Sequence, residues 1–270
     1  MTKSRIPGRK AAGALLAAMV FFLHGCFSDP ARTSYEKAEV HLSEGRFKEA
    51  LTEYSSVAMK YSSSPYGARS LLRAAFIYGA RLDDDERALK TYSEVIYLYP
   101  GTEEAATARR EKARIYSIRG EHSKAVEEYQ ALLELGREPA EKTRFQIAME
   151  YVKMNDLKQA RVELADLLKS PVSGDLRKLA RFQMANTYYL EGDREEALKE
   201  FEDIIREYQE TAVSYEALFT KARLLDEQGR LSEALEILKG LEGKYPNREA
   251  LKTAEEWTEK RLNTDPVRRR

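Results

Sequence analysis

Cysteine is almost missing from this chain of 270 residues: Cys26 is the only one, so no disulfide can form within the chain. Charge of one sign is not in excess either, because 45 basic residues balance 45 acidic ones. Residues 1–25 carry four basic residues and no acidic one, so the remainder has 41 basic and 45 acidic side chains, a net charge near −4. A nucleic-acid-binding protein needs a basic excess, and we therefore expect no nucleic-acid partner.

Residue types that support catalysis or metal binding are also scarce. Only His41 and His122 follow residue 25, without metal-ligand spacing, and no glycine-rich phosphate loop is present. Acid pairs such as Glu127–Glu128 and Glu195–Glu196 fall on faces of predicted helices that we expect to be solvated. The sequence therefore predicts no catalytic residue, no metal, no cofactor and no small-molecule substrate.

The first 25 residues have the pattern of a signal peptide. A basic segment is followed by an uncharged apolar run of 13 residues, Ala11 to Leu23, which is too short to span a bilayer comfortably. The run ends in Leu23-His24-Gly25-Cys26, which resembles the lipobox of bacterial lipoproteins, although His24 departs from the usual small residue. The resemblance implies cleavage before Cys26 and attachment of lipid to its thiol. The alternatives are an ordinary secretion signal, or an uncleaved anchor with an incidental cysteine.

A lipidated Cys26 would anchor the chain stably, because several acyl chains hold a protein at a membrane where one binds only marginally. Phe27 and Ser28 follow the cysteine, rather than the Asp that tends to retain proteobacterial lipoproteins in the inner membrane. We therefore expect the periplasmic face of the outer membrane, with the inner membrane or a secreted periplasmic form as alternatives. Residues 26–33 are predicted to form a short tether, and Cys26 lies nine steps from Tyr35, at most about 30 Å.

An internal repeat dominates the rest of the chain. Two alanines recur in each of six segments, and five of the six pairs are 12 residues apart. The first alanines are Ala38, Ala75, Ala113, Ala148, Ala185 and Ala222, and the second are Ala50, Ala88, Ala125, Ala160, Ala197 and Ala234. This spacing predicts two antiparallel helices that cross closely at small residues, with Gly, Asn or Asp in the left-handed conformation between them.

Large apolar residues follow each second alanine at positions four and seven, on one helix face. They are Tyr54, Tyr92, Tyr129, Leu164, Phe201 and Leu238, followed by Val57, Val95, Leu132, Leu167, Ile204 and Leu241. A single helix pair cannot bury this face alone, so we expect the pairs to stack around a continuous core.

The repeats resemble the tetratricopeptide family, with most repeats about three residues longer than the usual 34. The resemblance implies an all-α, right-handed superhelical solenoid over residues 34–262, followed by a basic tail at 263–270. Its repeats lie at about 31–64, 65–101, 102–137, 138–171, 174–210 and 211–247, and a capping helix follows at 248–262. In that last helix, Leu251 and Trp257 are expected to cover the exposed apolar end of the stack.

Envelope proteins of this family carry repeats that look like these. Second helices that end in Tyr-Pro, as at Tyr99-Pro100 and Tyr245-Pro246, are similar to those of BamD-type lipoproteins and of Tol-Pal-associated periplasmic proteins. The segment around Tyr35, Phe47 and Tyr61 is the part most similar to BamD. The longer insertions of BamD beyond its second repeat are not found.

A candidate partner site follows from the first helices, which are expected to line a concave groove. Aromatic residues take one equivalent position in repeats four to six, with Arg110 at that position in repeat three. Basic residues and a tyrosine flank the row. The members are Arg110, Phe145, Phe182 and Phe219, flanked by Arg144, Arg181, Arg223 and Tyr189. Such a row suits an apolar peptide with acidic neighbours, and the alternative is that the rings belong to the core.

These features together predict a membrane-anchored scaffold that binds proteins or peptides of the cell envelope. A BamD-like role in outer-membrane protein assembly is the leading interpretation. A pilotin-like role in secretin or pilus assembly, and the docking of peptidoglycan enzymes, remain alternatives.

Overall fold

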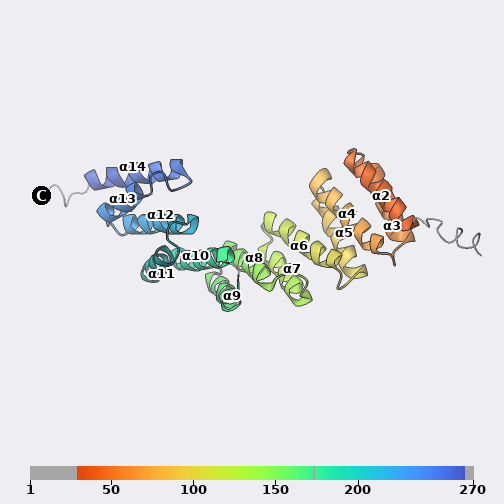
Figure 1. Ribbon diagram of the computed structural model, residues 1–270, viewed down its shortest axis with the longest axis horizontal. Coiled ribbons are helices and arrows are strands. Elements are labelled where there is room, and N and C mark those ends of the chain that lie inside the picture. Colours follow the sequence, from red (N-terminus) through yellow and green to blue (C-terminus); the bar gives the residue numbers. More distant parts are fainter. Residues whose placement is uncertain (1–28, 173, 265–270) are drawn as a thin grey trace, which may run out of the picture. The chain divides into compact units, whose positions relative to one another are not determined.

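The computed structural model describes residues 29–172 and 174–264. Over these residues the helix is the only regular secondary structure, and short turns join one helix to the next. Contacts divide the chain into two compact units, with the division between Thr91 and Tyr92. The described helices, coloured along the chain in Figure 1, are α2 (Pro30–Ser43), α3 (Phe47–Lys60), α4 (Pro65–Leu82), α5 (Asp85–Leu98), α6 (Glu103–Ile118), α7 (His122–Leu135), α8 (Ala140–Lys153), α9 (Leu157–Lys169), α10 (Gly174–Glu191), α11 (Arg194–Glu207), α12 (Ala212–Glu227), α13 (Leu231–Gly240) and α14 (Arg248–Thr264). The expected class, six helix pairs followed by a last helix, is confirmed. The right-handed superhelical path stays a prediction.

The first and last described helices extend beyond their expected limits. Helix α2 begins at Pro30, so the last four residues of the predicted tether 26–33 are helical. The cause is local: the Asp29 side chain accepts a hydrogen bond of 2.9 Å from the Ala31 amide, and proline suits the first helical position. Helix α14 likewise runs to Thr264, into the predicted tail 263–270. The predicted signal peptide 1–25, the lipidation site Cys26 and the remaining tail lie outside the described residues.

Each helix pair turns at one residue in the left-handed conformation, as the sequence predicts. These residues are Gly45, Asp83, Gly120, Asn155, Gly192 and Gly229, with φ values between 53° and 86°. Glycine adopts this conformation without the steric cost that a β-carbon brings, and Asn and Asp tolerate it better than other residues. A single residue that tolerates this conformation therefore lets the chain reverse direction between the two helices of each pair.

Gly192 has a φ of 86° and offers a direct test of this turn. Gly192→Ala should lower the free energy of unfolding by about 1–2 kcal/mol, because a β-carbon is strained in this conformation. Chemical denaturation followed by circular dichroism measures the loss. Gly174→Ala is the matched control, since Gly174 starts α10 without a positive φ and its added β-carbon would meet nothing within 4 Å. An equal loss in both variants would contradict the turn argument.

The twelve repeated alanines lie where the helices approach each other, and each is 0% exposed. The large residues four and seven positions after each second alanine are buried as well. Gly79 shows how tight a crossing is, because a β-carbon added there would lie 3.3 Å from the Ala88 β-carbon. The predicted core positions are confirmed, and many of them lie in clusters that each join one repeat to the next repeat or to the last helix.

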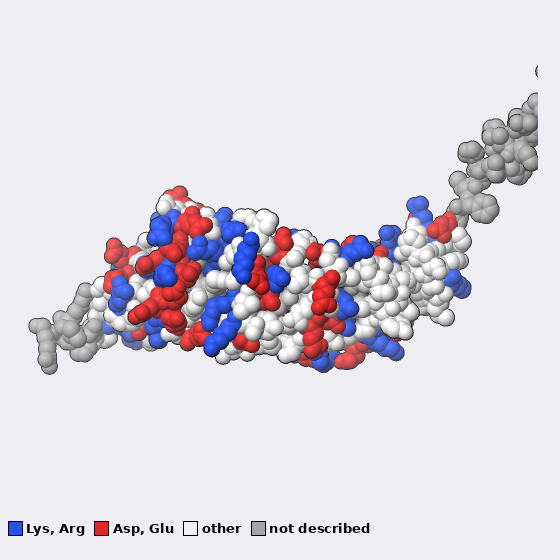
Figure 2. Space-filling model, turned by 90° about the horizontal axis from the view of Figure 1, so that it is seen from below, with Lys and Arg blue, Asp and Glu red and all other residues white. Residues whose placement is uncertain are grey.

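Successive first helices also contact one another within each unit. In the N-terminal unit α2 touches α4, and in the C-terminal unit α8 touches α10, α10 touches α12 and α12 touches α14. The first helices therefore share one face, which is where the sequence analysis places the partner site. Acidic and basic side chains are interspersed on the molecular face drawn in Figure 2.

A buried carboxylate joins three helices of the third and fourth repeats. Glu150 on α8 is 2% exposed. Its carboxylate accepts hydrogen bonds of 2.8 Å from the Ser117 hydroxyl on α6 and from Lys153 Nζ, and it lies 2.8 Å from Nδ1 of His122 at the start of α7. Burial alone would raise the pKa of Glu150, but the hydrogen bonds from Lys153, His122 and Ser117 outweigh it and lower the pKa. The folded protein therefore stabilises the charged form of the Glu150 carboxylate.

Candidate functional site

The predicted aromatic row packs mainly against the cores of its own repeats. Phe182 lies with its ring centroid 5.8 Å from that of Phe201, and Phe219 stacks on Tyr245 at 4.5 Å with an angle of 15° between the planes. Phe145 packs against the buried cluster around Leu164. These contacts are of the kind that stabilise a core, and Phe219 also lines a groove.

The predicted flanking arginines are engaged by carboxylates of the same chain. Arg144 Nη1 donates to Glu163 at 2.9 Å, and Arg181 donates to Glu207 at 2.5 Å and to Glu200 at 3.5 Å. Arg110 pairs with Glu138. The Arg144–Glu163 and Arg181–Glu200 pairs each join the first and second helices of one repeat.

The same pair recurs in the third repeat, where Arg109 Nη1 donates to Glu128 at 3.0 Å and Lys112 Nζ lies 2.6 Å from the same carboxylate. In all three repeats the glutamate follows its arginine by 19 residues. The expectation that Glu128 is solvated is therefore wrong: two basic side chains of α6 partly cover it. The pairs bridge the two helices of a repeat, so their arginines are already engaged by carboxylates of the chain.

The Arg144–Glu163 pair should contribute little to stability, because both groups keep some contact with water. A double-mutant cycle with Arg144→Ala, Glu163→Ala and the combined variant should give a coupling energy of about 0.2–1 kcal/mol. Urea denaturation of the four proteins measures it. A coupling well above this range would mean that the pair is a principal link between α8 and α9.

Tyr189 connects two first helices. Its hydroxyl donates to Glu227 on α12 at 2.5 Å, and burial together with this hydrogen bond raises the pKa of Tyr189. The contact joins α10 to α12 on the face that the first helices share, next to Arg223. Of the predicted row and its flanks, Phe219, Arg223 and Tyr189 thus lie near one another, while Phe145, Arg144 and Arg110 belong to earlier repeats.

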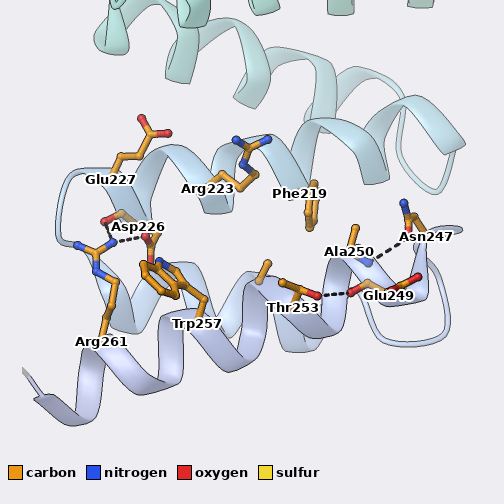
Figure 3. Close-up of a pocket in the computed structure, with 11 residues that line it drawn as sticks. Phe219, Arg223, Asp226, Glu227, Asn247, Glu249, Ala250, Thr253, Trp257 and Arg261 are labelled. Atoms are coloured by element: carbon orange, nitrogen blue, oxygen red, sulfur yellow. Dashed lines mark hydrogen bonds and ion pairs between the residues drawn. The ribbon is translucent and has the colours of Figure 1, made fainter.

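A groove of about 730 Å³ opens between α12 and α14, where the last helix has no second helix after it among the described residues. Figure 3 shows Phe219 and Trp257 between the two helices, with Glu227 directed away from α14. The lining includes Phe219, Arg223, Asp226 and Glu227 of α12 and Ala250, Ala254, Trp257 and Arg261 of α14.

Trp257 is the residue that the sequence analysis placed wrongly. It was expected to cover the end of the core, yet it is 60% exposed and lines the groove, while Leu251 is buried as expected. The helical period gives the reason. Leu251 and the buried Thr258 are seven residues apart and share a face, whereas Trp257, six residues from Leu251, is rotated away from that face by about 120°.

Comparison with known proteins identifies the repeat. A family model described as a tetratricopeptide repeat matches residues 188–257, and a second with the same description matches residues 69–102. The chain contains tetratricopeptide repeats. No curated protein matches the sequence.

Solved structures of tetratricopeptide repeat proteins share the fold at low identity. A tetratricopeptide repeat protein from Parabacteroides merdae ATCC 43184 is 18% identical, with a TM-score of 0.61 and 86% of each chain covered. YrrB, a TPR protein described as having an unusual peptide-binding site, is 19% identical, with a TM-score of 0.53 over 75% of this chain and 97% of YrrB. PilW, described as a widely conserved type IV pilus biogenesis factor, is 16% identical, with a TM-score of 0.53 over 83% of this chain and 97% of PilW.

Tetratricopeptide repeats are in general scaffolds that bind proteins or peptides, and typically they are not catalytic. Over residues 29–172 and 174–264, no group of three or more His, Cys, Asp or Glu side chains is placed to hold a metal ion. In the same segments, no helix is both long and apolar enough to cross a membrane. The groove between α12 and α14, with the exposed ring of Trp257, is a candidate for partner binding.

Proposed function

We propose that this chain is a lipid-anchored scaffold on the periplasmic face of the outer membrane, where it docks proteins of outer-membrane assembly as BamD-type lipoproteins do. The observation that carries the docking role is the groove between α12 and α14, which leaves the large side chain of Trp257 exposed. Exposed aromatic side chains in a concave site are typical of protein-binding surfaces, because their burial by a partner is strongly favourable.

The anchoring role is supported by the sequence around Cys26. The only cysteine of the chain closes a 13-residue apolar run, in the pattern of a lipobox. Helix α2 begins at Pro30, only four steps beyond this cysteine, a distance of at most about 14 Å for an extended chain. A lipid on Cys26 would therefore hold the first helix close to the membrane surface, which suits a scaffold that receives partners at the bilayer.

Co-purification tests the proposal. The intact protein is isolated from membranes in mild detergent beside a Cys26→Ala variant, and the bound proteins are identified. We expect the intact protein to recover a β-barrel assembly subunit and the variant to leave the membrane fraction. Normal levels of outer-membrane proteins after depletion of the chain would contradict a role in assembly.

A role in pilus or secretin assembly is the second candidate, and the similarity of fold to PilW favours it. The same co-purification separates the two, since a secretin or pilus subunit would be recovered in place of the assembly subunit. A secretin that assembles normally without this chain would exclude this second role.

A further inference from the structure

The groove between α12 and α14 has an apolar part that is open to a partner. Trp257 exposes 60% of its surface, and its neighbours in the groove include Phe219, Ala250 and Ala254. The two alanines present only methyl groups beside the rings. An aliphatic or aromatic side chain of a partner would be buried here against two rings.

The charged side chains around the groove differ in whether they have a partner within the chain. Arg261 pairs with Asp226, and Glu227 accepts the hydroxyl of Tyr189. Arg223 is exposed and forms no hydrogen bond or ion pair with any residue that the structure describes. Arg223 is therefore a cation at the rim that is available to a carboxylate, unlike the paired Arg144 and Arg181 of the earlier repeats.

One buried acceptor also lacks a partner. Asp226 is 8% exposed, and its Oδ2 accepts from Arg261 while its Oδ1 has no hydrogen-bond partner in the described chain. A buried oxygen without a partner costs free energy, but Oδ1 is shielded from the groove, so a ligand does not reach it.

We infer that this groove binds a peptide segment of a protein partner in which an apolar side chain is followed within a few residues by Asp or Glu. The apolar side chain packs on Trp257 and Phe219, and the carboxylate pairs with Arg223. This inference rests on the proposed docking function and names the chemistry of the partner.

Trp257 makes the site measurable, because it is the only tryptophan of the chain. The full chain in mild detergent is titrated with ten-residue Gly-Ser peptides that carry Leu followed by Asp at a spacing of one to four residues. At least one spacing should change the tryptophan emission in a saturable way. Counterparts in which Lys replaces Asp, or Ser replaces Leu, should bind at least tenfold more weakly.

A reversal of charge separates the ion pair from simple apolar binding. Arg223→Glu should invert the preference, so that the Leu–Lys peptide binds at least tenfold better than the Leu–Asp peptide. Arg206→Glu is the matched control, because it makes the same change in charge at an exposed position of α11 outside the groove and should leave the preference unchanged. Circular dichroism checks that both variants keep the helical content of the parent.

Three results would overturn the inference: equal binding of the Asp and Lys peptides to the parent chain, no saturable change with any peptide, or a preference that Arg223→Glu leaves as it was. These results do not depend on where the protein resides. If the peptides bind as expected while no envelope partner co-purifies, the proposed location is wrong, but the inference that the groove binds such peptides is supported. If partners co-purify and the peptides fail, the scaffold binds them elsewhere.

Discussion

Phe201→Ala should lower the free energy of unfolding by about 3–5 kcal/mol, because it removes a fully buried ring from a close-packed site. Phe201 is 0% exposed, and its neighbours in the core include the two alanines of its own repeat, Ala185 and Ala197. The helices on both sides already meet at these small residues, so they can move little to fill the space that the ring leaves.

Urea denaturation at neutral pH measures this loss, with Leu190→Ala as the control. Leu190 lies in the last turn of α10 in the same repeat and is 52% exposed, so its truncation should change stability by no more than about 0.5 kcal/mol. If the two variants lose the same stability, the core of this repeat is not packed around Phe201.

Glu150→Ala should lower the free energy of unfolding by about 1–3 kcal/mol at pH 7. The substitution removes the one carboxylate that Ser117, His122 and Lys153 share, and it leaves the half-buried Ser117 and His122 without that partner, while the exposed Lys153 can turn to water. Because the three groups come from α6, α7 and α8, the loss should loosen the contact between the third and fourth repeats.

The loss of stability caused by Glu150→Ala should depend on pH. The folded-state pKa of Glu150 is lowered from its ordinary value of 4.5, so its charge stabilises the fold fully above that pH, and the contribution disappears as the pH falls through the folded-state pKa. The difference between parent and Glu150→Ala should therefore shrink in denaturation series between pH 7 and pH 3. Glu127→Ala, at an exposed position of α7, should show neither the loss nor the pH dependence.

Local spacing allowed the repeat architecture to be predicted from the sequence. The alanine pairs and the turn residues act within about 15 residues of chain, and a helix period converts their spacing directly into a buried face. The positions of Ala185 and Ala197 at a crossing, and of Gly192 in the turn between them, therefore follow from sequence alone.

The candidate site depends on pairings that local spacing does not encode. Arg144 was expected to flank a groove, but its partner Glu163 lies on the next helix, and the rotation of both helices decides whether they meet. Glu150 collects groups from three helices, so no single segment reveals it. Trp257 was expected to cover the apolar end of the stack together with Leu251, although its position on the helix, six residues from Leu251, already indicates a different face.

The buried alanines have a consequence for how such a chain can evolve. Twelve positions admit little more than a methyl group, since a larger side chain would push two helices apart at a cost of about 1–3 kcal/mol. At exposed positions, mutation can replace residues with little penalty, and whole repeats can be gained or lost because each contacts only its neighbours. In keeping with this, the chain shares its fold with the Parabacteroides merdae protein over 86% of each chain at only 18% identity, and natural selection remains free to remodel the first-helix face for new partners.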